Sequence, residues 1–333
     1  MISKVGTMNM SDVVCVSHGK DTDGLASAAL VKIAKGADVI LADYGDFVER
    51  LMELKEPKEL YICDLGLNES IEGGFLAEVK RLTKKAKVIY IDHHPLDLNL
   101  KNKIKSLGVA LTHSTEQCAS MLVLQKLCKK LPKEAGLLAA YGAVTDYMDN
   151  HPSARKIVDG FDRQFVIFES TLLSHAISGS DGDTKVMDRF VDSLASLRYP
   201  HQIEGIYDLA LKQVESISQI LSEVRSNGVR LKNLAYMETD GGSTGNVANL
   251  LTGSFEVPVG IAYKLKKIEC VYEASLRGTG ESKKHLGKVV GKVAKIVGGS
   301  GGGHPNASGI RFPKNRLTEF LRLVEEELED QRF

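Results

Sequence analysis

Four short apolar runs near the start of the chain constrain its fold more than any other feature. They are rich in β-branched residues, are separated by stretches with helical spacing, and cover residues 13–17, 39–42, 60–63 and 88–91. Runs that are hydrophobic at consecutive positions are typical of parallel strands whose sheet is covered by helices on both faces. We therefore expect the first part of the chain to be an α/β domain with a parallel sheet.

The rest of the chain changes character twice. Residues 155–229 have helical spacing, and the pair Asn227-Gly228 is a typical place for a helix to end. Beyond it, four strand-like runs alternate with helical stretches at residues 246–251, 284–297 and 316–329. The 333 residues allow two domains of about 150 residues each. We predict a parallel-sheet domain at 1–152, a helical connector at 153–229 and a smaller α/β domain at 230–333.

Bulk composition narrows the class of protein. Basic and acidic residues number 43 each, so no overall field attracts a polyanion, although basic residues are in excess between Lys264 and Lys314. That local excess suits either a solvated surface or phosphate attraction. The five cysteines are scattered without a CxxC pair and are expected to be reduced core residues. Without a signal peptide or an apolar run of roughly 18 residues, we expect a soluble cytoplasmic protein that does not bind membranes.

Polar clusters follow the predicted strands. In open parallel sheets, the ligand crevice lies outside the carboxyl ends of the strands, so residues directly after each run share one edge. One further acidic residue lies in the helical stretch GAVTDY. The resulting set is His18, Asp21, Asp23, Asp64, Asp92, His93, His94 and Asp146.

A concentration of carboxylates and imidazoles at one edge would repel itself without cations. This mixture of donors suits divalent manganese, zinc or iron, and the absence of thiolate ligands argues against a purely structural zinc site. Six or seven candidate ligands exceed the needs of one ion. Two ions about 3.5–4 Å apart are the usual device for in-line displacement at phosphorus, so the sequence favours two-metal phosphoryl chemistry.

Each of these residues has a plainer interpretation when it is taken alone. Asp21 or Asp23 could cap a helix, Asp64 could begin a turn, and Asp146 could solvate a helix end. His18 could be an ordinary core or surface histidine. The same residue types recur at successive strand ends, however, and this recurrence favours the joint interpretation as a metal site.

The elements HGKDTDG, ICD, IDHH and AVTDY, in this order and spacing, resemble the four signature motifs of the DHH phosphoesterase superfamily. That group includes RecJ-type nucleases, NrnA-type oligoribonucleases, cyclic-dinucleotide phosphodiesterases and family II inorganic pyrophosphatases. The resemblance implies a first metal ion held by His18, Asp21 and Asp64. It implies a second ion held by Asp23, Asp64, His93 and Asp146, with Asp64 bridging the two.

The same resemblance implies catalytic roles for the two other residues of the Asp-His-His element. His94 would contact the scissile phosphate or orient ligands, and Asp92 would support the histidines. The gap between His18 and Asp21 varies among branches of the superfamily. Asp21 and Asp23 could therefore exchange duties.

The glycine-rich segment GGSGGGHPNASG, at residues 298–309, resembles the Gly-Gly-Gly-His element of the DHH-associated domain. Consecutive glycines let backbone N–H groups approach an anion in a nest, which His304 could complete with a hydrogen bond. Ser275-Leu-Arg277 resembles a second element of that domain, and Arg277 offers a bidentate fork to a phosphate. A flexible linker and a surface ion pair are the plainer alternatives. The expected substrate-binding residues are Arg277, Gly301, Gly302, Gly303 and His304.

These observations predict a manganese-dependent phosphodiesterase with two ions, magnesium being a possible substitute, that hydrolyses single-stranded or short oligonucleotide ends. The alternative substrates are a cyclic dinucleotide or phosphoadenosine phosphate. A catalytically silent RecJ-like replication or repair subunit is disfavoured because every matched ligand position is occupied. A homodimer and a replication or repair partner stay open. The ending HPNASG resembles archaeal RecJ-like proteins.

The remaining polar residues receive plainer assignments from the sequence. Five further histidines lack a carboxylate partner at ligand spacing and are expected to be surface or core residues: His113, His151, His175, His201 and His285. Asp43 and Asp46 follow the second apolar run and are interpreted as turn residues, with the crevice rim as the alternative.

Overall fold

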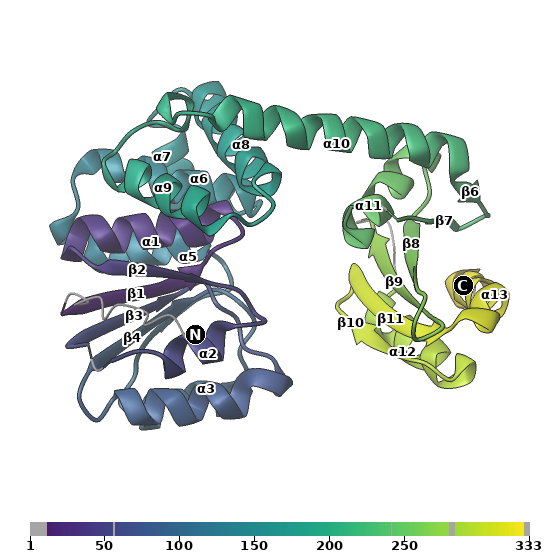
Figure 1. Ribbon diagram of the computed structural model, residues 1–333, viewed down its shortest axis with the longest axis horizontal. Coiled ribbons are helices and arrows are strands. Elements are labelled where there is room, and N and C mark those ends of the chain that lie inside the picture. The colour runs from purple at the N-terminus through teal and green to yellow at the C-terminus, as the bar shows by residue number, and fades with distance from the viewer. Residues whose placement is uncertain (1–11, 56, 241, 280–283, 330–333) are drawn as a thin grey trace, which may run out of the picture. The chain divides into compact units, whose positions relative to one another are not determined.

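The computed structural model describes residues 12–55, 57–240, 242–279 and 284–329. The chain divides into two compact units, which we call unit 1 (Met1–Gln213) and unit 2 (Val214–Phe333) (Figure 1). The opening segment, on which the expectation of no signal peptide rests, lies outside the described residues. Among the described helices, none combines the length and the apolar character that crossing a membrane requires.

Unit 1 is built on the five-stranded parallel sheet that the apolar runs predict. Its strand order is β2-β1-β3-β4-β5, so the order reverses at β1, between β2 on one side and β3 on the other. The sequence analysis did not identify β5, a four-residue edge strand that is only partly buried. The strands are β1 (Val13–His18), β2 (Asp38–Ala42), β3 (Glu59–Cys63), β4 (Lys87–Asp92) and β5 (Ala110–His113).

Helices cover both faces of this sheet, and each face has its own apolar core (Figure 1). One core is completed by α2 (Phe47–Met52), α3 (Glu69–Leu82) and α4 (Leu98–Ser106). The other is completed by α1 (Thr22–Lys35), α5 (Ala119–Leu127), α6 (Gly136–Thr145), α7 (Pro152–Val158), α8 (Arg163–Gly179) and α9 (Thr184–Ala195). Three short 3-10 turns are η1 (Cys128–Lys130), η2 (Lys133–Ala135) and η3 (Pro200–Gln202).

The helical segment after residue 152 contributes mostly to unit 1. Val166 of α8 and Phe190 of α9 are fully buried in the second of these cores. The long helix α10 (Ile206–Asn227) then spans the division between the two units. The boundaries expected from the sequence, at 152/153 and 229/230, stay predictions.

Unit 2 contains a six-stranded mixed sheet in the order β10-β11-β9-β8-β7-β6. Among these described strands, β7 and β8 pair in parallel, and the other neighbours are antiparallel. One core includes residues of α11 (Thr244–Phe255) and Val224 of α10, and a second includes residues of α12 (Leu286–Val297) and α13 (Leu317–Glu329). The strands and the short turn are β6 (Val229–Arg230), β7 (Leu234–Glu238), β8 (Val259–Lys266), β9 (Val271–Gly278), β10 (Ser300–Gly303), β11 (Ala307–Pro313) and η4 (Lys314–Arg316).

Candidate metal centre

The predicted cluster forms at the carboxyl edge of the sheet of unit 1. His18 is the last residue of β1, Asp64 directly follows β3, and Asp92 ends β4 ahead of His93 and His94. β1 and β3 are neighbours on either side of the point where the strand order reverses. In sheets of this order that point is where ligands bind, because the connections leave in opposite directions and open a crevice.

Asp21 caps helix α1 and is also part of the cluster. Its carboxylate accepts hydrogen bonds from the Gly24 N–H at 2.9 Å and from His18 Nδ1 at 2.8 Å. Burial alone would raise the pKa of Asp21, but the bond from the His18 ring holds this pKa below its ordinary value. The plainer interpretation as a helix cap and the interpretation as a ligand are therefore both compatible with its position.

Asp23 ties the start of α1 to the start of α5. It is fully buried and accepts hydrogen bonds from the backbone N–H groups of Ala119, at 2.6 Å, and Ser120, at 3.0 Å, as well as from the Ser120 hydroxyl. The first N–H groups of a helix have no partner within the helix, so they favour an anion such as this carboxylate. Burial nevertheless raises the pKa of Asp23, and the nearby Asp21 carboxylate adds to this rise. Asp23 thus has a structural role that the sequence analysis did not foresee.

Asp64 lies at the centre of the cluster. It is 1% exposed, has a left-handed backbone with φ of 56°, and neither carboxylate oxygen has a hydrogen-bond partner among the described residues. His93 Nε2 is 3.2 Å and His18 Nδ1 3.8 Å from its oxygens. Burial and the surrounding carboxylates hold the pKa of Asp64 well above its ordinary value. A buried carboxylate without a hydrogen bond is costly, so this arrangement fits a site that receives cations.

His93 lies between Asp64 and Asp146. Its Nε2 is 3.2 Å from Asp64 Oδ1 and 3.6 Å from Asp146 Oδ2, although Asp146 comes from the end of α6 and not from a strand. Burial, followed by the charges of Asp23 and Asp21, raises the pKa of Asp146 to about 9. Asp146 is thus at a helix end, as the plainer interpretation has it, and its carboxylate also belongs to the cluster.

Among the described residues, three groups of side chains could hold a metal ion, because the ligand atoms within each group lie within 4.8 Å of one another. The first is the predicted trio His18, Asp21 and Asp64. The second contains three of the four residues predicted for the other ion, and the third brings His94 to Asp64 and His93. The groups are His18-Asp21-Asp64, Asp23-His93-Asp146 and Asp64-His93-His94.

Asp92 and His94 form a supported pair behind the cluster. Asp92 is fully buried, and its carboxylate accepts hydrogen bonds from His94 Nδ1 at 2.9 Å and from the Tyr90 hydroxyl at 3.3 Å. Gly66 makes room for the ring, since a Cβ there would lie 2.6 Å from His94 Cγ. The ring orientation of His94 is thus fixed from one side.

Two neighbours of this pair escaped the sequence analysis. The Tyr44 hydroxyl lies 2.8 Å from His94 Nε2, and its ring centroid lies 5.0 Å from that of His18. His113, expected to be an ordinary histidine, ends β5 and places Nε2 2.6 Å from the backbone oxygen of His94. Both residues follow or end strands at the same edge, and this is the signal that could have found them.

Asp43 lies at the rim of the cluster, the alternative that the sequence left open for it. Its carboxylate contacts Lys20 Nζ at 2.7 Å and lies 3.6 Å from His18 Nε2. Burial opposes the effect, but the Lys20 ammonium holds the pKa of Asp43 below its ordinary value. Asp46, in contrast, accepts a hydrogen bond from the Asp43 N–H as a turn residue does.

In unit 2 the glycine cluster differs from the predicted nest. Gly301, Gly302 and Gly303 belong to the edge strand β10 and pair with β11 in antiparallel register. The small residues allow this pairing to be close, because a Cβ at Gly301 would lie 2.6 Å from the Gly309 carbonyl oxygen. The physical reason is that the backbone groups of these glycines pair with β11, so the segment is a strand and not an open nest.

The predicted substrate residues of unit 2 lie around this edge. Gly301 lines a hollow of about 430 Å³ together with Thr244 and Ser275, whose hydroxyl groups are hydrogen-bonded at 2.8 Å. Arg277 packs over the start of α11, where a Cβ on Gly245 would lie 2.5 Å from its guanidinium. The side chain of His304 is exposed just beyond β10.

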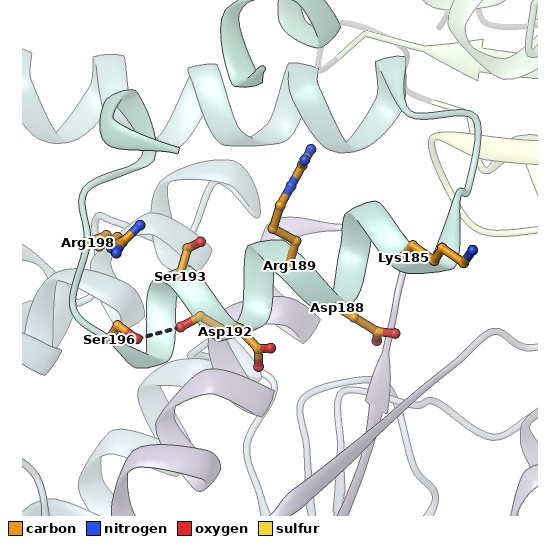
Figure 2. A pocket seen from close by; sticks show the side chains of 7 residues that line it. All are labelled: Lys185, Asp188, Arg189, Asp192, Ser193, Ser196 and Arg198. Atoms are coloured by element: carbon orange, nitrogen blue, oxygen red, sulfur yellow. Dashed lines mark hydrogen bonds between the residues drawn. The ribbon is translucent and has the colours of Figure 1, made fainter. Parts of the chain in front are cut away.

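A separate hollow of about 510 Å³ lies on α9 in unit 1 (Figure 2). Its lining carries both signs of charge, including Asp188, Arg189 and Arg198. None of the predicted metal or substrate residues lines it. The candidate site of unit 1 is therefore the sheet edge and not this hollow.

Comparisons with known proteins agree with this architecture. Residues 231–330 match the family model of the DHHA1 domain, whereas no curated protein matches the sequence. The pGpG-specific phosphodiesterase PggH from Vibrio cholerae has 14% identity and a TM-score of 0.63, over 96% of this chain and 100% of that one. The DHH domain of a member of a family of ribosomal proteins has 16% identity and a TM-score of 0.69, over 97% of this chain and 88% of that one.

A third similar structure is RecJ from Thermus thermophilus in complex with Mn²⁺, with 16% identity and a TM-score of 0.65. The similarity covers 96% of this chain but only 52% of that one. At such low identities the likeness shows a shared fold. The DHHA1 match covers residues 231–330, and the chain shares its fold with PggH and RecJ, which agrees with the resemblance carried by its four motifs.

Proposed function

We propose that this chain is a metal-dependent phosphodiesterase that hydrolyses a nucleotidyl phosphodiester at the end of a single-stranded or short oligonucleotide. The observation that carries the proposal is Asp64, a buried carboxylate whose oxygens have no hydrogen-bond partner among the described residues. Removing such a charge from water is offset only when a cation or donor faces it. The DHHA1 domain and the fold shared with PggH and RecJ support phosphoester chemistry at this site.

The donor set favours Mn²⁺ over the other divalent cations. Carboxylates mixed with imidazoles and without thiolates suit this ion, and Mg²⁺ is the natural substitute where oxygen ligands dominate. We propose two ions, one in the group around His18 and one in the group around Asp146, with Asp64 between them. When bound, such ions lower the pKa of a nucleophilic water and neutralise charge on the phosphoryl oxygens.

The other side chains position the reacting groups. Asp92 fixes the ring of His94 through Nδ1, which leaves Nε2 beside the Tyr44 hydroxyl. The His94 side chain is partly exposed, so a phosphate oxygen can take the place of Tyr44 as the partner of Nε2. We assign to His94 the hydrogen bond to the scissile phosphate, and to Asp92 the positioning of that imidazole.

Unit 2 supplies the second phosphate contact in this proposal. Arg277, the glycines of β10 and His304 bind a phosphate of the substrate. The edge position of β10 supports this role, because one side of an edge strand keeps backbone N–H groups available to a ligand. The exposed ring of His304 is available to the same anion.

A small nucleotide is the second candidate substrate, and one observation favours it. The chain matches the whole length of PggH, a phosphodiesterase that is specific for the dinucleotide pGpG. We therefore place very short oligonucleotides first, with cyclic dinucleotides and phosphoadenosine phosphate as alternatives.

The test is a turnover assay of the full chain with Mn²⁺, Mg²⁺ or chelator. The substrates are an end-labelled single-strand series that begins at the dinucleotide, a cyclic dinucleotide and phosphoadenosine phosphate. We expect Mn²⁺-dependent release of mononucleotides, fastest for the shortest strands. Full turnover after rigorous chelation would overturn the proposal. Rapid cleavage of the cyclic dinucleotide with intact linear strands would reverse the substrate ranking.

Variants separate the two halves of the proposal. His304→Ala should raise KM for the dinucleotide about tenfold with little change in kcat, because it removes one charge-assisted contact to phosphate. Asp208→Asn is the matched control, since this exposed carboxylate on α10 lies outside all three ligand groups. An equal KM for His304→Ala and the control would remove unit 2 from the substrate site.

A further inference from the structure

Packing does not explain why a tyrosine stands at residue 147. It directly follows Asp146, its side chain is 90% exposed, and its ring makes no contact with another aromatic ring of the described residues. Single exposed apolar residues are common and need no special reason. The backbone of Tyr147, however, gives a reason to ask why a tyrosine stands here.

The chain at Tyr147 adopts a conformation that favours glycine. The N–H of Met148 bonds to the Ala143 carbonyl at 2.8 Å and that of Tyr147 to the Val144 carbonyl at 3.2 Å, which together form a Schellman motif at the end of α6. Tyr147 occupies its left-handed position, with φ of 59°. Glycine is common there because it has no Cβ to strain. A tyrosine at this position costs stability and contributes no buried contact in return.

The segment that carries Tyr147 is held on both sides. Before it, Asp146 Oδ2 lies 3.6 Å from His93 Nε2 in the metal centre. After it, Asp149 forms an ion pair with Arg163 at 2.8 Å, and His151 caps α7. Adjacent Cα atoms are about 3.8 Å apart, so the backbone of Tyr147 lies one residue from the candidate ligand Asp146. Its ring is thus exposed on a backbone that is held on both sides.

We propose that Tyr147 is a binding residue on which the base of the nucleotide at the metal centre stacks. The inference rests on the proposed function, because it takes the phosphate at the cluster to belong to a nucleotide. Tyr44 is another aromatic residue beside the cluster, but its hydroxyl and ring already contact His94 and His18. An aromatic face accepts any base, so stacking here adds affinity for a base-bearing substrate without selecting a sequence.

The test compares two substrates, one with normal nucleotides at its ends and one with abasic residues at both ends. The quantity measured is the ratio of kcat/KM for the base-bearing strand to that for the abasic strand. Tyr147→Gly should lower this ratio about tenfold, the weaker end of the range for loss of one stacked base. Glycine suits the left-handed position, so a loss cannot be attributed to unfolding.

Two control variants sharpen this comparison. Tyr147→Phe keeps the ring and should keep the ratio near that of the wild type. Tyr207→Ala removes another exposed tyrosine, on α10, and should leave the ratio unchanged. An unchanged ratio in Tyr147→Gly overturns the inference, and so does an equal loss in Tyr207→Ala.

A binding measurement distinguishes failure of this inference from failure of the proposed function. If the wild type cleaves neither strand, the phosphodiesterase proposal fails, and equilibrium dialysis of AMP and of ribose 5-phosphate with Mn²⁺ present decides the stacking separately. Tighter binding of AMP that is lost in Tyr147→Gly supports the role of Tyr147. Equal binding of the two ligands by the wild type overturns it.

Discussion

The carboxyl edge of the unit 1 sheet and the β10 edge of the unit 2 sheet were both predicted to bind ligands, but they are built in opposite ways. The first gathers charged side chains that are buried and packed against one another, with Asp64 at 1% exposure. The second is the strand β10, which consists of one serine and three glycines and is mostly exposed. One edge depends on side-chain charge and the other on backbone groups.

This difference determines how amino-acid substitutions affect each edge. In unit 1, several buried or partly buried carboxylates lie close together, so the site is costly until cations neutralise it. In unit 2, backbone groups at the edge cost little to keep in the absence of a ligand, because water reaches them. Chemical substitutions should therefore act on activity and metal affinity in unit 1, but mainly on backbone packing and substrate affinity in unit 2.

The largest effect should come from Asp64→Asn, which removes the charge at the centre of the ligand groups. We expect kcat to fall on the order of a thousandfold, as for the loss of a central electrostatic group in other active sites. The measurement is steady-state turnover of the dinucleotide with Mn²⁺. Asp208→Asn serves as the control, and comparable activity of the two variants would contradict the arrangement.

The next largest effect should be the increase in the free energy of unfolding when metal ions bind. At a free Mn²⁺ concentration of about 100 times Kd, linkage gives about 2.7 kcal/mol. For a unit of this size that corresponds to a rise in Tm of roughly 5–10 °C, measured by thermal unfolding with and without chelator. Asp64→Asn should lose most of the rise. An equal rise in that variant would place the ions elsewhere.

The β10 edge can be tested with two neighbouring glycines. Gly301→Ala should destabilise the protein by about 2 kcal/mol, because its Cβ would lie 2.6 Å from a backbone oxygen of β11. Gly302→Ala should change stability by less than about 0.5 kcal/mol, since nothing lies within 4 Å of a Cβ there. Urea unfolding measures both. A higher KM in Gly302→Ala would assign a ligand to this backbone, and equal destabilisation would contradict the strand pairing.

The smallest effect should be a gain in stability. Tyr147→Gly relieves the left-handed backbone and should raise the free energy of unfolding by about 1 kcal/mol in the absence of substrate. Thermal unfolding of the variant beside Tyr147→Phe, which keeps the strain, gives the comparison. A lower Tm for the glycine variant would show that the ring has a packing role.

The fold of unit 1 could be predicted because its signal is local. Strands buried on both faces must be apolar at consecutive positions, and β1, β3 and β4 show this in the sequence. The parallel arrangement then places the residues after each strand at one edge, which is how His18, Asp64 and His93 could be grouped in advance. β5 escaped detection because a partly buried edge strand needs no such run.

The parts of the site that could not be predicted depend on contacts between distant segments. The hydrogen bonds of Asp23 to the start of α5 join residues 96 and 97 positions apart. The contact of Tyr44 with His94 spans 50 positions, and no periodicity reports it. The glycine segment was expected to form a phosphate-binding nest, because its composition does not reveal that β11 pairs with it.

Gly142 shows how narrowly the centre is enclosed from behind. A Cβ at this position would lie 2.3 Å from Asp23 Oδ1 and 2.4 Å from the Ser120 hydroxyl, so even a methyl group would displace the carboxylate that joins α1 to α5. The close approach of α6 to α1 and α5, and with it the position of the Asp23 ligand, therefore depends on a glycine at residue 142. Among all twenty amino acids at residue 142, only glycine should preserve metal affinity, and alanine, elsewhere the mildest replacement, should here act as a ligand mutation.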